Sequence, residues 1–244
     1  MAEWYKDWFA DEDYLKVYCH RDDTDAEILI GTILSNIKIP VNAKILDAAC
    51  GAGRHSILLA KKGFLVTAFD LSQTLLNMAV ENSRSLGLDI NFITADLRTI
   101  QLEHEFDLIL NLFTSFGYFE KDEDNYKFVQ KAFNFIAPGG YFVLDFLNRN
   151  NLLRNFKSRS QRLIQDMKIL EERGIENDRI VKRIFLKRDG NQKEFFESVR
   201  LYSKDEIIYH FEEIGYKVYK IFGNYHGKPF DENDSERLII IFNR

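Results

Sequence analysis

The amino-acid sequence predicts an α/β protein with a doubly wound, mostly parallel sheet. Between residues 44 and 146, short apolar runs alternate with helical patterns, which is typical of parallel strands joined by helices. Residues 163–202 carry no comparable helical pattern, so an antiparallel insertion is predicted over residues 150–202, before the last helix. A length of 244 residues and a hydrophobic content of 45% suffice for one large domain with its own core.

The first forty residues are predicted to be largely helical. Six aromatic side chains lie among acidic residues in residues 1–20, at spacings typical of helices: Trp4, Tyr5, Trp8, Phe9, Tyr14 and Tyr18. Residues 24–38 are predicted to form an amphipathic helix that ends before Pro40, because proline cannot continue it. The apolar side of that helix comprises Ile28, Leu29, Ile33, Leu34 and Ile37.

Five strands and three helices are predicted for the centre of the chain. The strands cover residues 44–47, 65–69, 90–94, 106–112 and 141–146, and the helices cover about 54–62, 73–86 and 122–135. Ser72 is a typical N-cap for the second of these helices, and Gly87 a typical residue to end it. The fifth of these strands follows directly after Pro138, Gly139 and Gly140.

The remainder of the chain is predicted to add an insertion and two strands. The insertion has strands near 163–172, 179–188 and 192–202, the last two joined by a turn at residues 189–191. Ser203 is predicted to cap a helix over about 204–214, which Gly215 ends. Two late strands, 216–222 and 237–242, complete a seven-stranded sheet.

Charge and cysteine content exclude several classes of partner. Lys and Arg total 33 against 38 Asp and Glu, so the strongly basic footprint of a nucleic-acid-binding protein is absent. Cys19 and Cys50 give neither a disulfide framework nor a zinc spacing, which favours a cytoplasmic protein without a metal site. No signal peptide and no apolar run of roughly 18 residues is found, so we expect no membrane partner.

Three acidic residues follow three consecutive predicted strands. Asp47 ends the first strand, Asp70 the second and Asp96 the third. Because the carboxyl ends of parallel strands share one edge of a sheet, we expect these carboxylates to converge on one crevice. Gly51 and Gly53 let a ligand approach the backbone where the next helix begins, and a carboxylate at Asp70 can take both ribose hydroxyls of a nucleotide.

The same residues indicate which kind of nucleotide is expected, a dinucleotide or one that carries a sulfonium group. A dinucleotide-binding fingerprint has a third glycine where this sequence has Ser56. Asp47 also adds a negative charge that does not suit a pyrophosphate at a helix N-terminus, whereas a cationic sulfonium with an amino group suits it. An NAD-dependent oxidoreductase is therefore the least favoured interpretation.

With these residues, the sequence resembles the class I S-adenosylmethionine-dependent methyltransferases, over about residues 40–146 and by pattern only over 203–244. The resemblance implies a Rossmann-like fold and S-adenosylmethionine as cofactor. Ala49 replaces the first glycine of the family's first motif, in a variant that is frequent among small-molecule methyltransferases. The resemblance implies that Asp47 and residues 51–53 line the methionine end of the cofactor, including Gly51 and Gly53, and that Asp70 binds its ribose. The other implied cofactor contacts are Leu71, Asp96 and Leu97 at the adenine, and Asn111 and Leu112 after the fourth strand.

The segment 111–119 is similar to the corresponding stretch of bacterial sugar N-methyltransferases. It lacks the Asn/Asp-Pro-Pro-aromatic clamp of methyltransferases that act on flipped bases, so we expect methyl transfer to an N or O atom of a small molecule. In small-molecule members, antiparallel strands after the fifth strand cover the site or form dimers, so a homodimer is one expected assembly. An RNA or protein methyltransferase and a non-catalytic cofactor-binding subunit are the alternatives.

Two aromatic stretches are expected to flank the crevice. We predict that the N-terminal segment folds over it as a lid, against the alternative of a helix packed in the core. In-line methyl transfer requires orientation and, for a hydroxyl or ammonium nucleophile, loss of a proton. Tyr118 and His20 are the predicted catalytic bases, and the other candidate bases are Tyr14, His55 and His226. The predicted acceptor contacts are Tyr14, Phe116, Tyr118, Phe119 and Arg149.

A basic run follows the fifth strand. It contains no acid and comprises Arg149, Arg154, Lys157, Arg159 and Arg162. At the ligand side of the sheet it could receive the carboxylate or phosphate of an anionic acceptor, and a solvated charged surface is the alternative. We expect one domain over residues 1–244, with a lid segment (1–25), a cofactor-binding core (40–146), an antiparallel insertion (150–202) and a final part (203–244).

Overall fold

A seven-stranded, mostly parallel sheet forms the centre of the molecule, as predicted. The computed structural model describes residues 3–18, 23–103 and 105–244, and its strand order is β10-β11-β5-β4-β1-β2-β3, with β11 antiparallel to both neighbours. The strands are β1 (Lys44–Ala48), β2 (Leu65–Asp70), β3 (Asn91–Thr94), β4 (Phe106–Asn111), β5 (Ile136–Leu147), β10 (Lys217–Phe222) and β11 (Arg237–Asn243).

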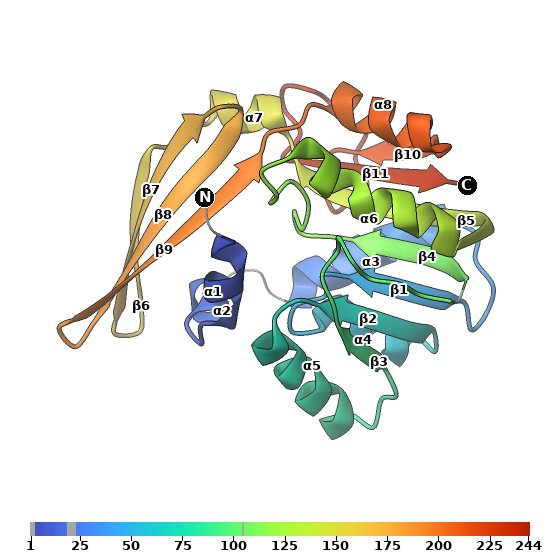
Figure 1. The fold of residues 1–244 in the computed structure, drawn as a ribbon, viewed down its shortest axis with the longest axis horizontal. Coiled ribbons are helices and arrows are strands. Elements are labelled where there is room, and N and C mark those ends of the chain that lie inside the picture. The colour runs from blue at the N-terminus through green and yellow to red at the C-terminus, as the bar shows by residue number, and fades with distance from the viewer. Residues whose placement is uncertain (1–2, 19–22, 104) are drawn as a thin grey trace.

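Helices cover both faces of this sheet (Figure 1). On one face, α6 and α8 pack through residues such as Phe128 and Phe211, and on the other α3, α4 and α5 pack through Leu29, Leu59 and Leu76. No helix within the described residues is long and apolar enough to cross a membrane. The helices are α1 (Trp4–Ala10), α2 (Tyr14–Val17), α3 (Asp23–Asn36), α4 (Arg54–Lys61), α5 (Gln73–Ser85), α6 (Asp122–Phe135), α7 (Arg149–Arg154) and α8 (Lys204–Ile214).

The predicted helix caps are present. The Ser72 hydroxyl accepts a hydrogen bond from the Leu75 N–H, and Ser203 forms a capping box with Glu206. On the predicted apolar side of α3, Leu29 and Ile33 are buried and Leu34 packs against the same core cluster. Ile28 is only partly buried, whereas Ala26 and Ile30, which were not predicted, are fully buried. The fifth strand begins earlier than predicted, at Ile136 rather than Tyr141. Residues 138–140 lie inside β5, where its pairing with β4 is irregular.

A separate antiparallel sheet stands beside the main sheet, with α1 and α2 between the two (Figure 1). It has four strands rather than the three predicted: β6 (Arg159–Ile164), β7 (Met167–Glu176), β8 (Arg179–Arg188) and β9 (Asn191–Arg200). The predicted strand 163–172 contains the turn between β6 and β7. That turn passes through Gln165 at a positive φ of 54° and has no glycine or proline to mark it.

Candidate active site

A cavity of about 600 Å³ lies at the carboxyl ends of the parallel strands, next to α1 and α2. It is formed where the three acids converge, which is the arrangement that the strand pattern predicted. The predicted cofactor residues that line it are Asp47, Ala49, Gly51, Asp70, Leu71, Asp96, Leu97 and Leu112.

The turn between β1 and α4 contains Gly51, which lines the cavity, and Gly53, which does not. Gly51 has a positive φ of 57°, and its N–H donates to Asp70 Oδ2 at 2.8 Å. Gly53 is absent from the cavity lining, and a Cβ there would come within 2.8 Å of Ala79 Cβ. Gly53 thus permits close packing of α4 against α5. Asn111 is also absent from the lining, since its amide donates to the Ala48 carbonyl.

Asp47 is a buried acid at the floor of the cavity, with 2% of its surface exposed. Burial raises its pKa to about 7, and the nearby Asp70 charge acts in the same direction. The Ser56 hydroxyl donates to Asp47 Oδ2 at 2.5 Å and offsets part of this effect. A cationic group placed here would favour the ionised carboxylate.

Asp70 is fixed by backbone donors. Its Oδ1 accepts from the Ser72 N–H and its Oδ2 from the Gly51 N–H, each at 2.8 Å. Burial raises the pKa of Asp70 above its ordinary value, although these backbone hydrogen bonds oppose the change. Because each carboxylate oxygen has two lone pairs, both oxygens can still accept hydroxyl groups of a ligand.

Asp96 is joined to the N-terminal segment through Arg98, a residue that the sequence analysis missed. Arg98 Nη2 lies 2.6 Å from Asp96 Oδ2 and 2.8 Å from Glu3 Oε1, and the guanidinium stacks 4.5 Å over the Phe119 ring. Burial would raise the pKa of Asp96, but its hydrogen bonds with Arg98 lower it below the ordinary value. The third acid of the crevice is therefore held as an ion pair.

The N-terminal segment packs on one side and lines the cavity on the other. Trp8 is fully buried in an apolar cluster with β7 and β8, and its ring lies 4.3 Å from that of Phe195. On the core side, the Ser72 hydroxyl donates to the Phe9 carbonyl at 2.6 Å. The segment thus packs against neighbouring elements, as a core helix would, and also lines the cavity, as a lid would. That it opens as a lid stays a prediction. The cavity-lining members are Tyr5, Phe9, Tyr14, Leu15 and Tyr18.

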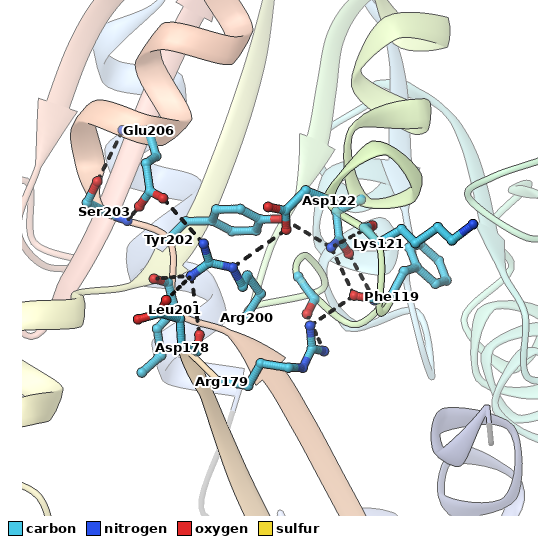
Figure 2. Close-up of polar contacts among 12 residues, drawn as sticks. Phe119, Lys121, Asp122, Asp178, Arg179, Arg200, Leu201, Tyr202, Ser203 and Glu206 are labelled. Atoms are coloured by element: carbon cyan, nitrogen blue, oxygen red, sulfur yellow. Dashed lines mark hydrogen bonds and ion pairs between the residues drawn. The ribbon is translucent and has the colours of Figure 1, made fainter. Parts of the chain in front are cut away.

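The antiparallel sheet holds the loop that carries Tyr118. At the start of β8, Arg179 donates to the backbone carbonyls of Gly117, Tyr118 and Phe119 at 2.9–3.0 Å. Figure 2 shows this guanidinium beside Phe119. The hydrogen bond between Tyr202 and Asp122 is drawn in the same view. The insertion is thereby joined to the rim of the cavity.

A second cavity of about 530 Å³ adjoins the first. Its walls come from the N-terminal segment, α7, the antiparallel sheet and the loop after β4. The residues that line both cavities are Phe9, Tyr14, Tyr18, Phe113 and Tyr118. The two cavities therefore meet at an aromatic wall.

A buried ion pair shapes this shared wall. Phe113 and Thr114 both adopt positive φ, at 56° and 64°, which non-glycine residues rarely do. The Asp145 side chain accepts from the Phe113 N–H at 3.0 Å, and its carbonyl accepts from the Thr114 N–H at 3.0 Å. Arg237 donates to Asp145 Oδ1 at 2.8 Å and to Thr114 Oγ1 at 2.9 Å.

The predicted catalytic and acceptor residues are not all brought together. Tyr14 and Tyr118 line both cavities and Phe119 lines the first, whereas His20 lies outside the described residues. Phe116 lines neither of these two cavities, because it is buried against Tyr126, Phe146 and Tyr202. Arg149 also lines neither, since its guanidinium bonds to Asp178 at 3.1 Å.

His55 lines the first cavity. Its Nε2 is buried and has no hydrogen-bond partner within the described part of the chain. Burial lowers its pKa to about 3, so the imidazole is neutral at pH 7. Its ring lies 5.1 Å from that of Phe113, which makes it an apolar support of the shared wall.

The comparisons with known proteins agree with this geometry. Residues 45–140 match a family model described as a methyltransferase domain. The match and the fold identify this core as a class I S-adenosylmethionine-dependent methyltransferase domain, as the sequence predicted. The domain is that of an enzyme family whose cofactor is S-adenosylmethionine.

Individual relatives cover different parts of the chain. It is 30% identical over 155 residues to the glycine/sarcosine N-methyltransferase of Halorhodospira halochloris, which is 62% of this chain and 56% of that protein. The matched segments span about half the length of the first curated relatives.

Two solved structures show that the fold extends over nearly the whole chain. A methyltransferase from Clostridium acetobutylicum superimposes with a TM-score of 0.82 at 22% identity, over 97% of this chain and 98% of that chain. The sugar N-methyltransferase KedS8 from Streptoalloteichus superimposes with a TM-score of 0.72 at 16% identity, over 96% and 92%. At these identities the likeness concerns the fold.

Proposed function

We propose that this protein transfers the methyl group of S-adenosylmethionine to an N or O atom of a small-molecule acceptor. The observation that carries the proposal is the pair of adjoining cavities, one with acids after three parallel strands and one without them. Their aromatic boundary suits a sulfonium methyl group on one side and a nucleophile on the other. Such an arrangement supplies the alignment that in-line displacement requires.

Each of the three acids of the first cavity has a role in this proposal. Asp47 binds the amino group of the cofactor, Asp70 the ribose hydroxyls, and Asp96 the adenine edge through its fixed position beside Arg98. During transfer the S–CH₃ bond breaks, a bond from the methyl carbon to the acceptor N or O forms, and a proton leaves the acceptor. Tyr118, in the wall of both cavities, is the proposed base, and S-adenosylhomocysteine is the product.

A small-molecule acceptor is supported by the size of the second cavity and by relatives such as a glycine/sarcosine and a ubiquinone-biosynthesis methyltransferase. We further propose a cytoplasmic setting, which the free thiol of Cys50 supports. A homodimer, expected from the insertion, stays part of the proposal and is checked by size-exclusion chromatography with light scattering.

Calorimetric titration with S-adenosylhomocysteine, and with NAD as the control, tests the cofactor. The expected result is binding of the former alone, and binding of NAD alone would overturn the proposal. A screen of acceptors with a labelled methyl donor then tests turnover. Labelling of RNA or protein with a steep salt dependence would instead support the macromolecular alternative, and binding without labelling of any acceptor would support a non-catalytic subunit.

A further inference from the structure

Polar side chains of residues 151–173 line one part of the second cavity, here called its polar end. Arg173 Nη1 donates to Ser160 Oγ at 3.0 Å, and the Arg173 N–H donates to the Ser158 carbonyl at 2.7 Å. Lys157 precedes Ser158 in the chain and also lines the cavity, as do Asn151 and Asn155. The amides of both asparagines donate to backbone carbonyls, so Lys157 and Arg173 are the cationic groups of this end.

The charged groups that line this cavity are mostly basic. They are Lys157, Arg173, Lys182 and Arg237 against a single acid, Glu197. Arg237 is neutralised by Asp145 and Lys182 by Glu197. Glu171 forms ion pairs with two guanidinium groups, those of Arg162 and Arg173.

Lys157 differs from the other basic residues of its segment. Its four basic neighbours each form an ion pair: Arg149 with Asp178, Arg154 with Asp234, Arg159 with Glu172 and Arg162 with Glu171. Lys157 forms an ion pair or hydrogen bond with none of the described residues. Glu171 can balance only one of the two guanidinium charges of Arg162 and Arg173. Together with Lys157, this gives the polar end of the cavity an excess of positive charge.

A cationic acceptor has no comparable site here. Glu197 is the acid in the lining, and both of its oxygens are engaged. Oε1 accepts from Trp8 Nε1 at 2.7 Å and from the Tyr18 hydroxyl, and Oε2 lies 2.5 Å from Lys182 Nζ. The negative charge of Glu197 is already balanced by Lys182, so a second ammonium group would find no uncompensated acid among these lining residues.

We propose that the acceptor carries an oxyanion, a carboxylate or a phosphate, bound at the end formed by Lys157, Ser160 and Arg173. Its methyl-accepting atom then lies at the wall shared with the first cavity, beside Phe113 and Tyr118. This inference rests on the proposed function, because it assigns the second cavity to the acceptor. It also locates the anion-binding role, expected for the whole basic run, at one lysine of that run together with β6 and β7.

Calorimetry on the full-length protein saturated with S-adenosylhomocysteine tests this inference. The probes are benzoate and phenyl phosphate, each compared with neutral benzamide and cationic benzylamine. At least one anion is expected to bind about tenfold more tightly than benzamide, as one charge-assisted contact provides, and the tighter anion distinguishes carboxylate from phosphate. Lys157→Ala is expected to reduce this preference about two- to fivefold, because the site is partly exposed.

Lys168→Ala is the matched control, since Lys168 is an exposed lysine of β7 outside both cavities, and it is expected to leave the preference unchanged. Equal or tighter binding of benzamide or benzylamine would overturn the charge assignment, as would absence of anion binding up to about 10 mM. So would a preference that Lys157→Ala leaves intact or that Lys168→Ala reduces equally. Failure of S-adenosylhomocysteine to bind would instead overturn the proposed function, so the two failures are distinguishable.

Discussion

Trp8 and Glu197 are 189 residues apart in the chain, yet Trp8 Nε1 donates to Glu197 Oε1 at 2.7 Å. Tyr18 and Lys182 bind the same carboxylate. Glu197 therefore joins the N-terminal segment to the antiparallel sheet, while Arg98 and Ser72 join that segment to the core. If the segment is a lid, these contacts hold it closed.

Replacing Glu197 is expected to loosen the N-terminal segment. Glu197→Gln leaves Lys182 without its counter-charge, whereas Trp8→Phe removes one hydrogen bond and keeps most of the packing on Phe195. Limited proteolysis should cleave residues 3–18 faster in Glu197→Gln than in Trp8→Phe, and S-adenosylhomocysteine should slow cleavage of the wild-type protein. Equal cleavage with and without S-adenosylhomocysteine would argue against a lid.

The stability of the protein without cofactor is expected to fall as pH rises, in part through Asp47. Its pKa is about 7 in the folded state and 3.8 when unperturbed, so between these values the folded state binds more protons than the unfolded state. The loss is complete above pH 7 and is on the order of 4 kcal/mol. Urea unfolding should show a flatter pH profile for Asp47→Asn than for the wild type.

Asp189→Asn, a change in an exposed turn, serves as the control and should reproduce the wild-type profile. Asp47→Asn should also weaken binding of S-adenosylhomocysteine by about tenfold or more, because the amino group loses a buried charged partner. Tight binding by this variant would contradict the role proposed for Asp47.

The two small residues around the glycine turn are expected to respond in opposite ways. Ala49 has a positive φ of 57°, so Ala49→Gly removes a strain of about 1–2 kcal/mol against an entropic cost of about 0.5–1 kcal/mol. Gly53→Ala places a Cβ within 2.8 Å of Ala79 at a φ of 78°, and should cost about 2 kcal/mol or more. Thermal melts should rise slightly for the first variant and fall for the second.

Tyr118→Phe is expected to lower kcat about a hundredfold, the usual contribution of a general base, and to leave binding of S-adenosylhomocysteine within about twofold. Tyr5→Phe is the matched control, because Tyr5 stacks on Tyr118 but lines only the cofactor cavity of the two. Full activity of Tyr118→Phe on an identified acceptor excludes it as the base. Equal losses in both variants would assign the effect to aromatic packing.

Local patterns in the sequence were enough to predict the core. Asp47, Asp70 and Asp96 could be placed at one edge because strand, turn and helix follow each other within a few residues, and Ser72 and Ser203 mark their helices by capping. The same patterns predicted a doubly wound sheet, but they did not specify the order of its strands.

Long-range partners could not be predicted in this way. The pairing of Arg149 with Asp178 and the approach of Arg179 to Tyr118 join segments at least 29 residues apart, so no spacing rule identifies them. Gly53 belonged to a ligand motif but serves helix packing, because both uses need the same absent side chain. The aromatic character of Phe116 likewise fits a core as well as a site.

The second cavity draws most of its wall from outside the segment that matches the methyltransferase domain. Within residues 45–140 it includes Phe113, Thr114 and Tyr118, and its other lining residues precede or follow that segment. Under the proposed assignment of this cavity to the acceptor, selection for a new acceptor can act on α7 and the antiparallel sheet while the cofactor-binding residues stay unchanged. Divergence in these outer segments, more than in the domain itself, measures how far two such enzymes differ in substrate.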